Sequence, residues 1–125
     1  MTSETLRATA DRLVANCREG REMQGLDELY DPGAVSVEAM EMNGPGSAVS
    51  TGLAAIKAKH DWWNGAFEVT GGKVEGPYLH GADRFAVIFA METRNRATGE
   101  TGAMQEVALY TVNDAGRIAR EEFFY

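Results

Sequence analysis

The chain has few of the residues that anchor metals or form disulfides. It has one cysteine and two histidines in 125 residues. The lone Cys17 excludes an internal disulfide, and His60 and His80 are too far apart in the chain to give a close metal-ligand spacing. The sequence therefore predicts neither a disulfide framework nor a metal site.

Long apolar runs and positive charge are also scarce. The longest apolar run, Phe85 to Met91, is far shorter than the ~20 residues that cross a bilayer. Acidic residues outnumber basic ones by 19 to 12, which gives a net charge of −7 and repels a phosphate backbone. We therefore expect no membrane span and no nucleic-acid partner.

Targeting and cofactor motifs are missing as well. The start of the chain lacks the basic and then apolar pattern of a signal peptide, and with an unpaired cysteine this predicts a cytoplasmic protein. A phosphate loop, a Gly-x-Ser-x-Gly elbow and a dinucleotide fingerprint are all absent. No cofactor is implied, and the length fits a single domain over residues 1–125.

The most informative stretch runs from Met104 to Tyr125. Two β-rich segments flank the turn sequence of residues 113–116, which predicts a hairpin. Because side chains alternate along a strand, an even register places Glu121 across from Ala108 or Tyr110 and on the same face as Glu106. Two carboxyl groups among bulky aromatic residues indicate a pocket.

The earlier part of the chain predicts three helices. Apolar spacing of three and four residues supports helices over residues 3–19, 26–30 and 51–64, with Ser3 and Thr51 as possible caps. In the third helix His60 and Trp63 share the apolar stripe with Ile56, whereas Lys59 falls at the border with the solvent side. Tyr30, the last residue of the second helix, is expected in the core.

Strands are expected over residues 34–42, 67–80 and 84–94, before the hairpin. Gly71 and Gly72 interrupt the second of these, and Pro77 favours an edge position for it. The Gly- and Ser-rich segment 43–52 resembles the loops that form lids or binding rims. Helices in the N-terminal half followed by a meander of strands predict an α+β domain with helices covering one concave sheet face.

The two faces of the predicted sheet differ. The bulkier face, which the helices should cover, holds Glu106 and Glu121 together with Phe85, Phe89, Met104, Tyr110 and Phe123. The other face is too apolar to stay wholly exposed, and its residues are Ile88, Val107, Leu109, Ile118 and Phe124. A homodimer formed through this face is expected.

Several segments resemble one fold family. They are Leu29 to Glu38, Gly52 to Trp63, Arg84 to Val87 and Asn113 to Ile118. The chain resembles the nuclear transport factor 2-like superfamily in its SnoaL-like branch, which includes polyketide cyclases and ketosteroid isomerases. The resemblance implies a cone-shaped, strongly curved, mostly antiparallel sheet of the cystatin-like kind. It does not select an activity, because the superfamily hosts isomerases, cyclases and non-catalytic binders.

The functional residues of that family match this chain in part. Glu38 falls where ketosteroid isomerases place their general base. The family's oxyanion-binding tyrosine has no counterpart in the first helix, and Ala108 takes the place of its protonated acid. Phe123 aligns with the aspartate that polyketide cyclases carry on their last strand, and Glu121 is the nearest acid.

We therefore select candidate catalytic residues and candidate ligand contacts. The catalytic candidates are Glu38, His60, Glu106 and Glu121, and the ligand-binding candidates are Trp63, Phe85, Phe89, Met104, Tyr110, Phe123 and Tyr125. In an enzyme, Glu38 or Glu121 would be the base and His60 or Tyr125 the partner of a developing oxyanion. The glutamates could instead form a structural network, and His60 could be a core residue. The hypotheses are thus cofactor-free proton transfer on a small apolar carbonyl compound, or a ligand-binding or dimeric interaction protein of the same fold.

Overall fold

The computed structural model describes residues 1–41 and 47–125 and has helices and strands in the expected order. The helices are α1 (Ser3–Arg18), α2 (Glu22–Leu29) and α3 (Leu53–Ala66). The strands are β1 (Tyr30–Val37), β2 (Val49–Thr51), β3 (Phe67–His80), β4 (Arg84–Asn95), β5 (Thr101–Val112) and β6 (Ile118–Phe124). The predicted α+β class is confirmed.

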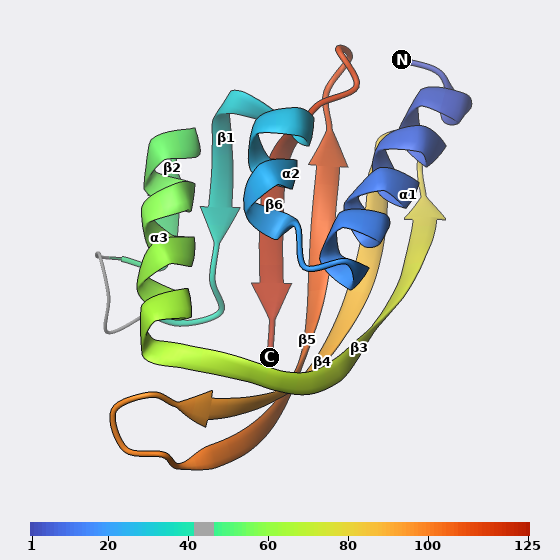
Figure 1. The fold of residues 1–125 in the computed structure, drawn as a ribbon. Helices are drawn as coiled ribbons and strands as arrows, with labels where there is room; N and C mark the ends of the chain where they lie inside the picture. The colour runs from blue at the N-terminus through green and yellow to red at the C-terminus, as the bar shows by residue number, and fades with distance from the viewer. Residues whose placement is uncertain (42–46) are drawn as a thin grey trace.

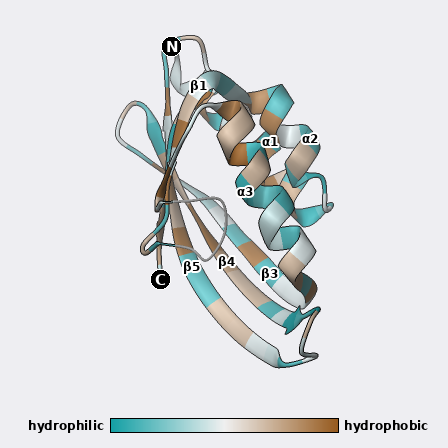
Figure 2. Ribbon diagram, turned by 90° about the vertical axis from the view of Figure 1, so that its left-hand side faces the viewer, coloured by the Kyte–Doolittle hydropathy of each residue, from teal (hydrophilic) through white to brown (hydrophobic). Residues whose placement is uncertain are grey.

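The strands form one curled sheet in the order β2-β1-β6-β5-β4-β3 (Figure 1). All neighbouring strands pair antiparallel except β1 and β6, which run parallel. Figure 2 shows the three helices on one side of the sheet, which bends around them. The site is therefore built where the helices face the concave side of the sheet.

Helix α1 packs as its apolar spacing predicts, although its cap differs by one residue. Thr2, not Ser3, is the N-cap, because its hydroxyl accepts a hydrogen bond of 3.1 Å from the backbone N–H of Thr5. The buried residues Leu6, Ala10 and Leu13 recur at three- and four-residue spacing and join the core cluster. This helix therefore closes one side of the concave face.

Strand β3 is continuous through Gly71 and Gly72, where the sequence suggested an interruption. A Cβ atom on Gly72, whose φ is +140°, would lie 2.0 Å from the carbonyl oxygen of Ala90. Register shifts against β4 after Val69 and after Glu75 bend the strand, as bulges do. Glycine thus permits close pairing in a bent strand, and β3 is an edge strand, as Pro77 predicted.

The second helix and the first strand have different bounds from those expected. Helix α2 begins at Glu22, and Tyr30 is the first residue of β1. Part of the predicted rim segment forms β2, in which Ser50 pairs with Ser36. The predicted end of the first strand at Met42 and the rim residues 43–46 lie outside the described residues.

The core lies between the helices and the sheet. Ile118 belongs to it and is 0% exposed, so its predicted place on the outer face is wrong. The reason is a register shift between Thr111 and Val112 in the β5–β6 pair, which turns Ile118 toward the covered side. The outer face keeps Val107 and Phe124, whose exposed fractions are 39% and 51%.

Within the described part of the chain, no helix has the length and apolarity needed to cross a membrane. The cytoplasmic location expected from the sequence stays a prediction.

Candidate functional site

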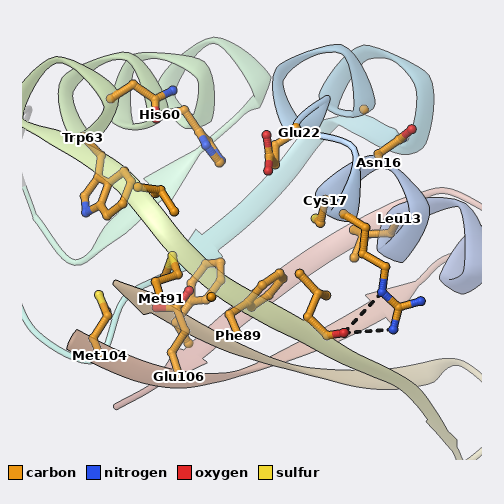
Figure 3. Close-up of a pocket in the computed structure, with 18 of the residues that line it drawn as sticks. Leu13, Asn16, Cys17, Glu22, His60, Trp63, Phe89, Met91, Met104 and Glu106 are labelled. Atoms are coloured by element: carbon orange, nitrogen blue, oxygen red, sulfur yellow. Dashed lines mark hydrogen bonds between the residues drawn. The ribbon is translucent and has the colours of Figure 1, made fainter. Parts of the chain in front are cut away.

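A cavity of about 850 Å³ lies between the helices and the concave face of the sheet. Figure 3 shows His60 and Trp63 of α3 on one side of it and Phe89, Met104 and Glu106 of the sheet on the other. Most of its lining is apolar, which suits a small ligand held by hydrophobic contact and oriented by a few polar groups.

The structure brings the selected residues together, with one exception. The cavity is lined by Glu38, His60, Trp63, Phe89, Met104, Glu106, Tyr110, Phe123, Glu121 and Tyr125. Phe85 is the exception: it is 0% exposed and stacks on Tyr110, with ring centroids 4.8 Å apart. Its selection as a ligand contact is corrected, because it packs in the core beneath the cavity.

Strand register spaces the polar groups along the cavity floor. Glu121 pairs with Tyr110 on one side, as the even hairpin register predicts, and with Ser36 on the other. Glu106 pairs with Phe89 and lies four residues before Tyr110 on β5. At ~3.4 Å per residue, Glu106 and Glu121 mark two separate positions on the same face.

Glu121 forms the inner polar position. It is 1% exposed, and the hydroxyl of Tyr30 donates a hydrogen bond to its Oε2. Its Oε1 has no hydrogen-bond partner among the described residues. Burial, followed by the negative charge of Glu121, raises the pKa of Tyr30 well above its ordinary value. Tyr30 is buried as expected, but its polar contact with Glu121 was not foreseen.

Lys59 is a site residue that sequence reasoning missed. It is 7% exposed, its Nζ lies 3.0 Å from Glu38 Oε1, and it donates a hydrogen bond to Ser36 Oγ. The Tyr125 hydroxyl donates to Glu38 Oε2 at 3.1 Å. Lys59 follows Ile56 by three residues, so it shares the buried stripe, and this spacing was the available signal.

Glu106 is the carboxyl group on the floor that takes part in none of the hydrogen bonds and ion pairs found among the described residues. Its pKa is raised to about 7, first by burial and then by the negative charge of Glu38, while Lys59 acts in the opposite direction. Protonated and ionised forms of Glu106 therefore coexist near neutral pH. Such a group can both accept and return a proton.

His60 and Cys17 line the cavity without an evident activating partner. Burial lowers the pKa of His60, although the negative charge of Glu121 opposes the effect, so the imidazole is neutral at neutral pH. Burial raises the pKa of Cys17 to about 12, which makes its thiol unreactive. In the described residues no group of three or more His, Cys, Asp or Glu side chains is arranged to hold a metal ion.

Comparisons with known proteins agree with this architecture. A family model described as a SnoaL-like domain matches residues 3–125. A solved structure from Mesorhizobium loti, described as a SnoaL-like polyketide cyclase, is 38% identical, with full coverage of both chains and a TM-score of 0.83. No curated protein matches the chain.

Two more distant structures share the fold. Δ5-3-ketosteroid isomerase from Mycobacterium sp. is 20% identical over 100% of this chain and 94% of the other, with a TM-score of 0.72. A Mycobacterium tuberculosis protein in complex with estradiol-17β-hemisuccinate is 19% identical over 100% and 95% of the two chains, with a TM-score of 0.72.

Proposed function

The chain belongs to the SnoaL-like domain family, and from that premise we propose that it catalyses cofactor-free proton transfer on a small apolar carbonyl compound. The observation that carries the proposal is Glu106. It is a partly buried carboxyl group on the floor of an apolar cavity, it is unpaired among the described residues, and its pKa is raised to about 7. A base of this strength can remove a proton next to a carbonyl group and return it to another carbon.

Glu38, the position suggested by the family resemblance, is less suited to be the base. Its two oxygens face the ammonium group of Lys59 and the hydroxyl group of Tyr125. Both of its oxygens are therefore already engaged by protein groups. Glu106 has no such contact in the described structure. We therefore assign the role of base to Glu106 and the role of counter-charge to Lys59 to Glu38.

The proposal is tested by hydrogen–deuterium exchange in small cyclic ketones such as 2-tetralone. NMR in D₂O should show that the protein accelerates loss of the protons next to the carbonyl group. The exchange rate should rise with pH up to about 7 and then level off, because the ionised form of Glu106 is the base. Ketone binding without accelerated exchange at any pH would contradict proton transfer.

That contrary result would favour the second candidate, a ligand-binding protein without chemistry. The observation in its favour is that solved structures of this fold include the estradiol-17β-hemisuccinate complex and a computationally designed 17-OHP binder, 20% identical with a TM-score of 0.73. An apolar cavity of about 850 Å³ can serve either use.

We also propose that two copies associate through the outer sheet face, where Val107 and Phe124 are exposed. Val107→Lys should convert a dimer into a folded monomer, because the interface would bury an unpaired charge. Sedimentation gives the mass, and circular dichroism shows that the fold is kept. Val69→Lys, at an equally apolar but cavity-lining position that is 50% exposed, is the matched control and should stay dimeric. A monomeric parent protein at micromolar concentration would refute the proposal.

A further inference from the structure

The cavity contains a positive charge, that of Lys59, which proton abstraction by Glu106 alone does not require. It projects from α3 and lines the cavity, yet it is 7% exposed. Burying an ammonium group costs several kcal/mol unless partners replace its water, so its position calls for a reason. Ser36 of β1 and Glu38, which directly follows β1, supply two oxygen partners, and the ring centroid of Phe123 lies 5.1 Å from Nζ.

These partners leave the ammonium group with an unused donor. An ammonium group carries three N–H bonds. The Ser36 hydroxyl and the Glu38 carboxylate take at most two of them. Among the described residues no other hydrogen-bond partner of Nζ is found, so the third N–H bond is left for a ligand in the cavity that Lys59 lines.

We propose that Lys59 binds the oxygen on which negative charge develops when a carbonyl ligand loses its proton. This inference rests on the proposed function and adds the electrophilic residue that proton transfer needs. An enolate oxygen is an anion, and a buried ammonium group stabilises it far more than water does. The ligand class is narrowed accordingly to ketones whose enolate, or phenols whose phenolate, reaches Lys59.

The position of Lys59 relative to Glu106 fits this division of roles. Glu38, its ion-pair partner, directly follows the last residue of β1, the strand that pairs with β6, and Glu106 lies on β5, which pairs with β6 on the other side. The two groups are close enough that the positive charge of Lys59 partly offsets the rise in the pKa of Glu106. Both groups line the same cavity, so one ligand can contact both.

The residues expected from the sequence to bind the oxyanion are less suitable. The Tyr125 hydroxyl already donates to Glu38. His60 is a neutral imidazole and so offers no positive charge. Three other cations line the cavity, but each is exposed and already in contact: Arg18 donates to the carbonyl oxygen of Val74, Lys73 pairs with Glu75, and Arg96 donates to the carbonyl oxygen of Asn64. Lys59 is the buried cation of the lining, and its charge acts on Glu106.

The test measures ionisation of a bound phenol and needs no turnover. 2-Naphthol is added to the Glu106→Gln protein, which removes the nearby competing carboxylate, and absorbance is followed against pH. We expect bound naphthol to ionise about 1 to 3 pH units below free naphthol, because an ammonium group within a few ångströms favours the anion. An unshifted ionisation, or no naphthol binding, would overturn the inference.

Variants separate this role from a structural one. Adding Lys59→Met with Glu38→Gln removes both charges of the ion pair, so neither is left buried alone, and the shift should disappear. Lys59→Arg should keep part of it. Lys57→Met, at a half-exposed lysine paired with Asp27, should keep all of it. A shift that survives removal of Lys59 in a folded protein refutes the role.

Failure of this inference and failure of the proposed function give different results. If bound naphthol ionises early but ketones do not exchange protons, Lys59 binds anions and Glu106 is not a working base. If ketones exchange normally in the variant without Lys59, the function stands and the role of Lys59 is refuted.

Discussion

Replacing Glu106 by Gln should slow ketone proton exchange about 10²- to 10⁴-fold, the usual contribution of a positioned general base. Gln keeps the size of the side chain but cannot accept the proton. The remaining rate should lose its rise toward pH 7, because that rise reports ionisation of Glu106. NMR exchange rates between pH 5 and 9 measure both effects.

Two controls test whether the effect belongs to Glu106. Glu92→Gln, at an exposed position on the neighbouring strand β4, should exchange ketone protons at the parent rate. Glu38→Gln removes the counter-charge of Lys59 and should reduce the rate but keep its rise with pH, which should level off at lower pH because the negative charge of Glu38 helps to raise the pKa of Glu106. A larger loss in Glu38→Gln than in Glu106→Gln would return the role of base to Glu38.

Glu106→Gln should also change how the free energy of unfolding depends on pH. The pKa of Glu106 is raised from 4.5 to about 7 in the folded protein, so the folded state holds a proton that the unfolded chain releases. Its contribution to stability is complete below the unfolded pKa and is lost as pH rises through about 7. The melting temperature of Glu106→Gln should therefore rise relative to that of the parent protein as pH increases across that window.

The largest effect on stability is expected at Phe85. Phe85→Ala should lower the free energy of unfolding by about 3 to 5 kcal/mol, because a fully buried aromatic side chain leaves a cavity. Denaturant unfolding measures the loss. The surviving folded protein should bind ketones with parent affinity, since Phe85 does not line the ligand cavity.

Tyr78→Ala is the control. Tyr78 is 52% exposed, so this substitution should lower the free energy of unfolding far less. If Phe85→Ala does not fold, Phe85→Leu should show a smaller loss of stability in the same direction. Parent-like stability combined with weaker ketone binding would restore Phe85 as a ligand contact.

Phe85 and Glu121 mark what the sequence could and could not predict. Alternation along strands places both on the covered face, and the even hairpin register predicts the pairing of Glu121 with Tyr110. Alternation does not say how far along the strand the helices stop packing and the cavity begins. That depth separates Phe85 in the core from Phe89 in the cavity wall.

Lys59 and Ile118 were misjudged for other reasons. Lysine at the edge of an apolar stripe usually extends its ammonium group to water. The partners that hold it inside, Ser36 in β1 and Glu38 just after it, are distant from Lys59 in the chain. Ile118 lies beside a register shift in the β5–β6 pair, which adds a residue to β6 and reverses the alternation. Long-range pairing and bulges are not visible in local periodicity.

The position of β6 has a consequence for how the molecule is made. It is the last strand in chain order but lies inside the sheet, between β1 and β5. Until it has been synthesised, a growing chain would leave two strand edges open to pairing with other chains. Joining β1 to β6 closes a loop of most of the sequence, a contact that slows folding. Assembly of the complete sheet should therefore wait for β6, and the edges of β1 and β5 stay open until then.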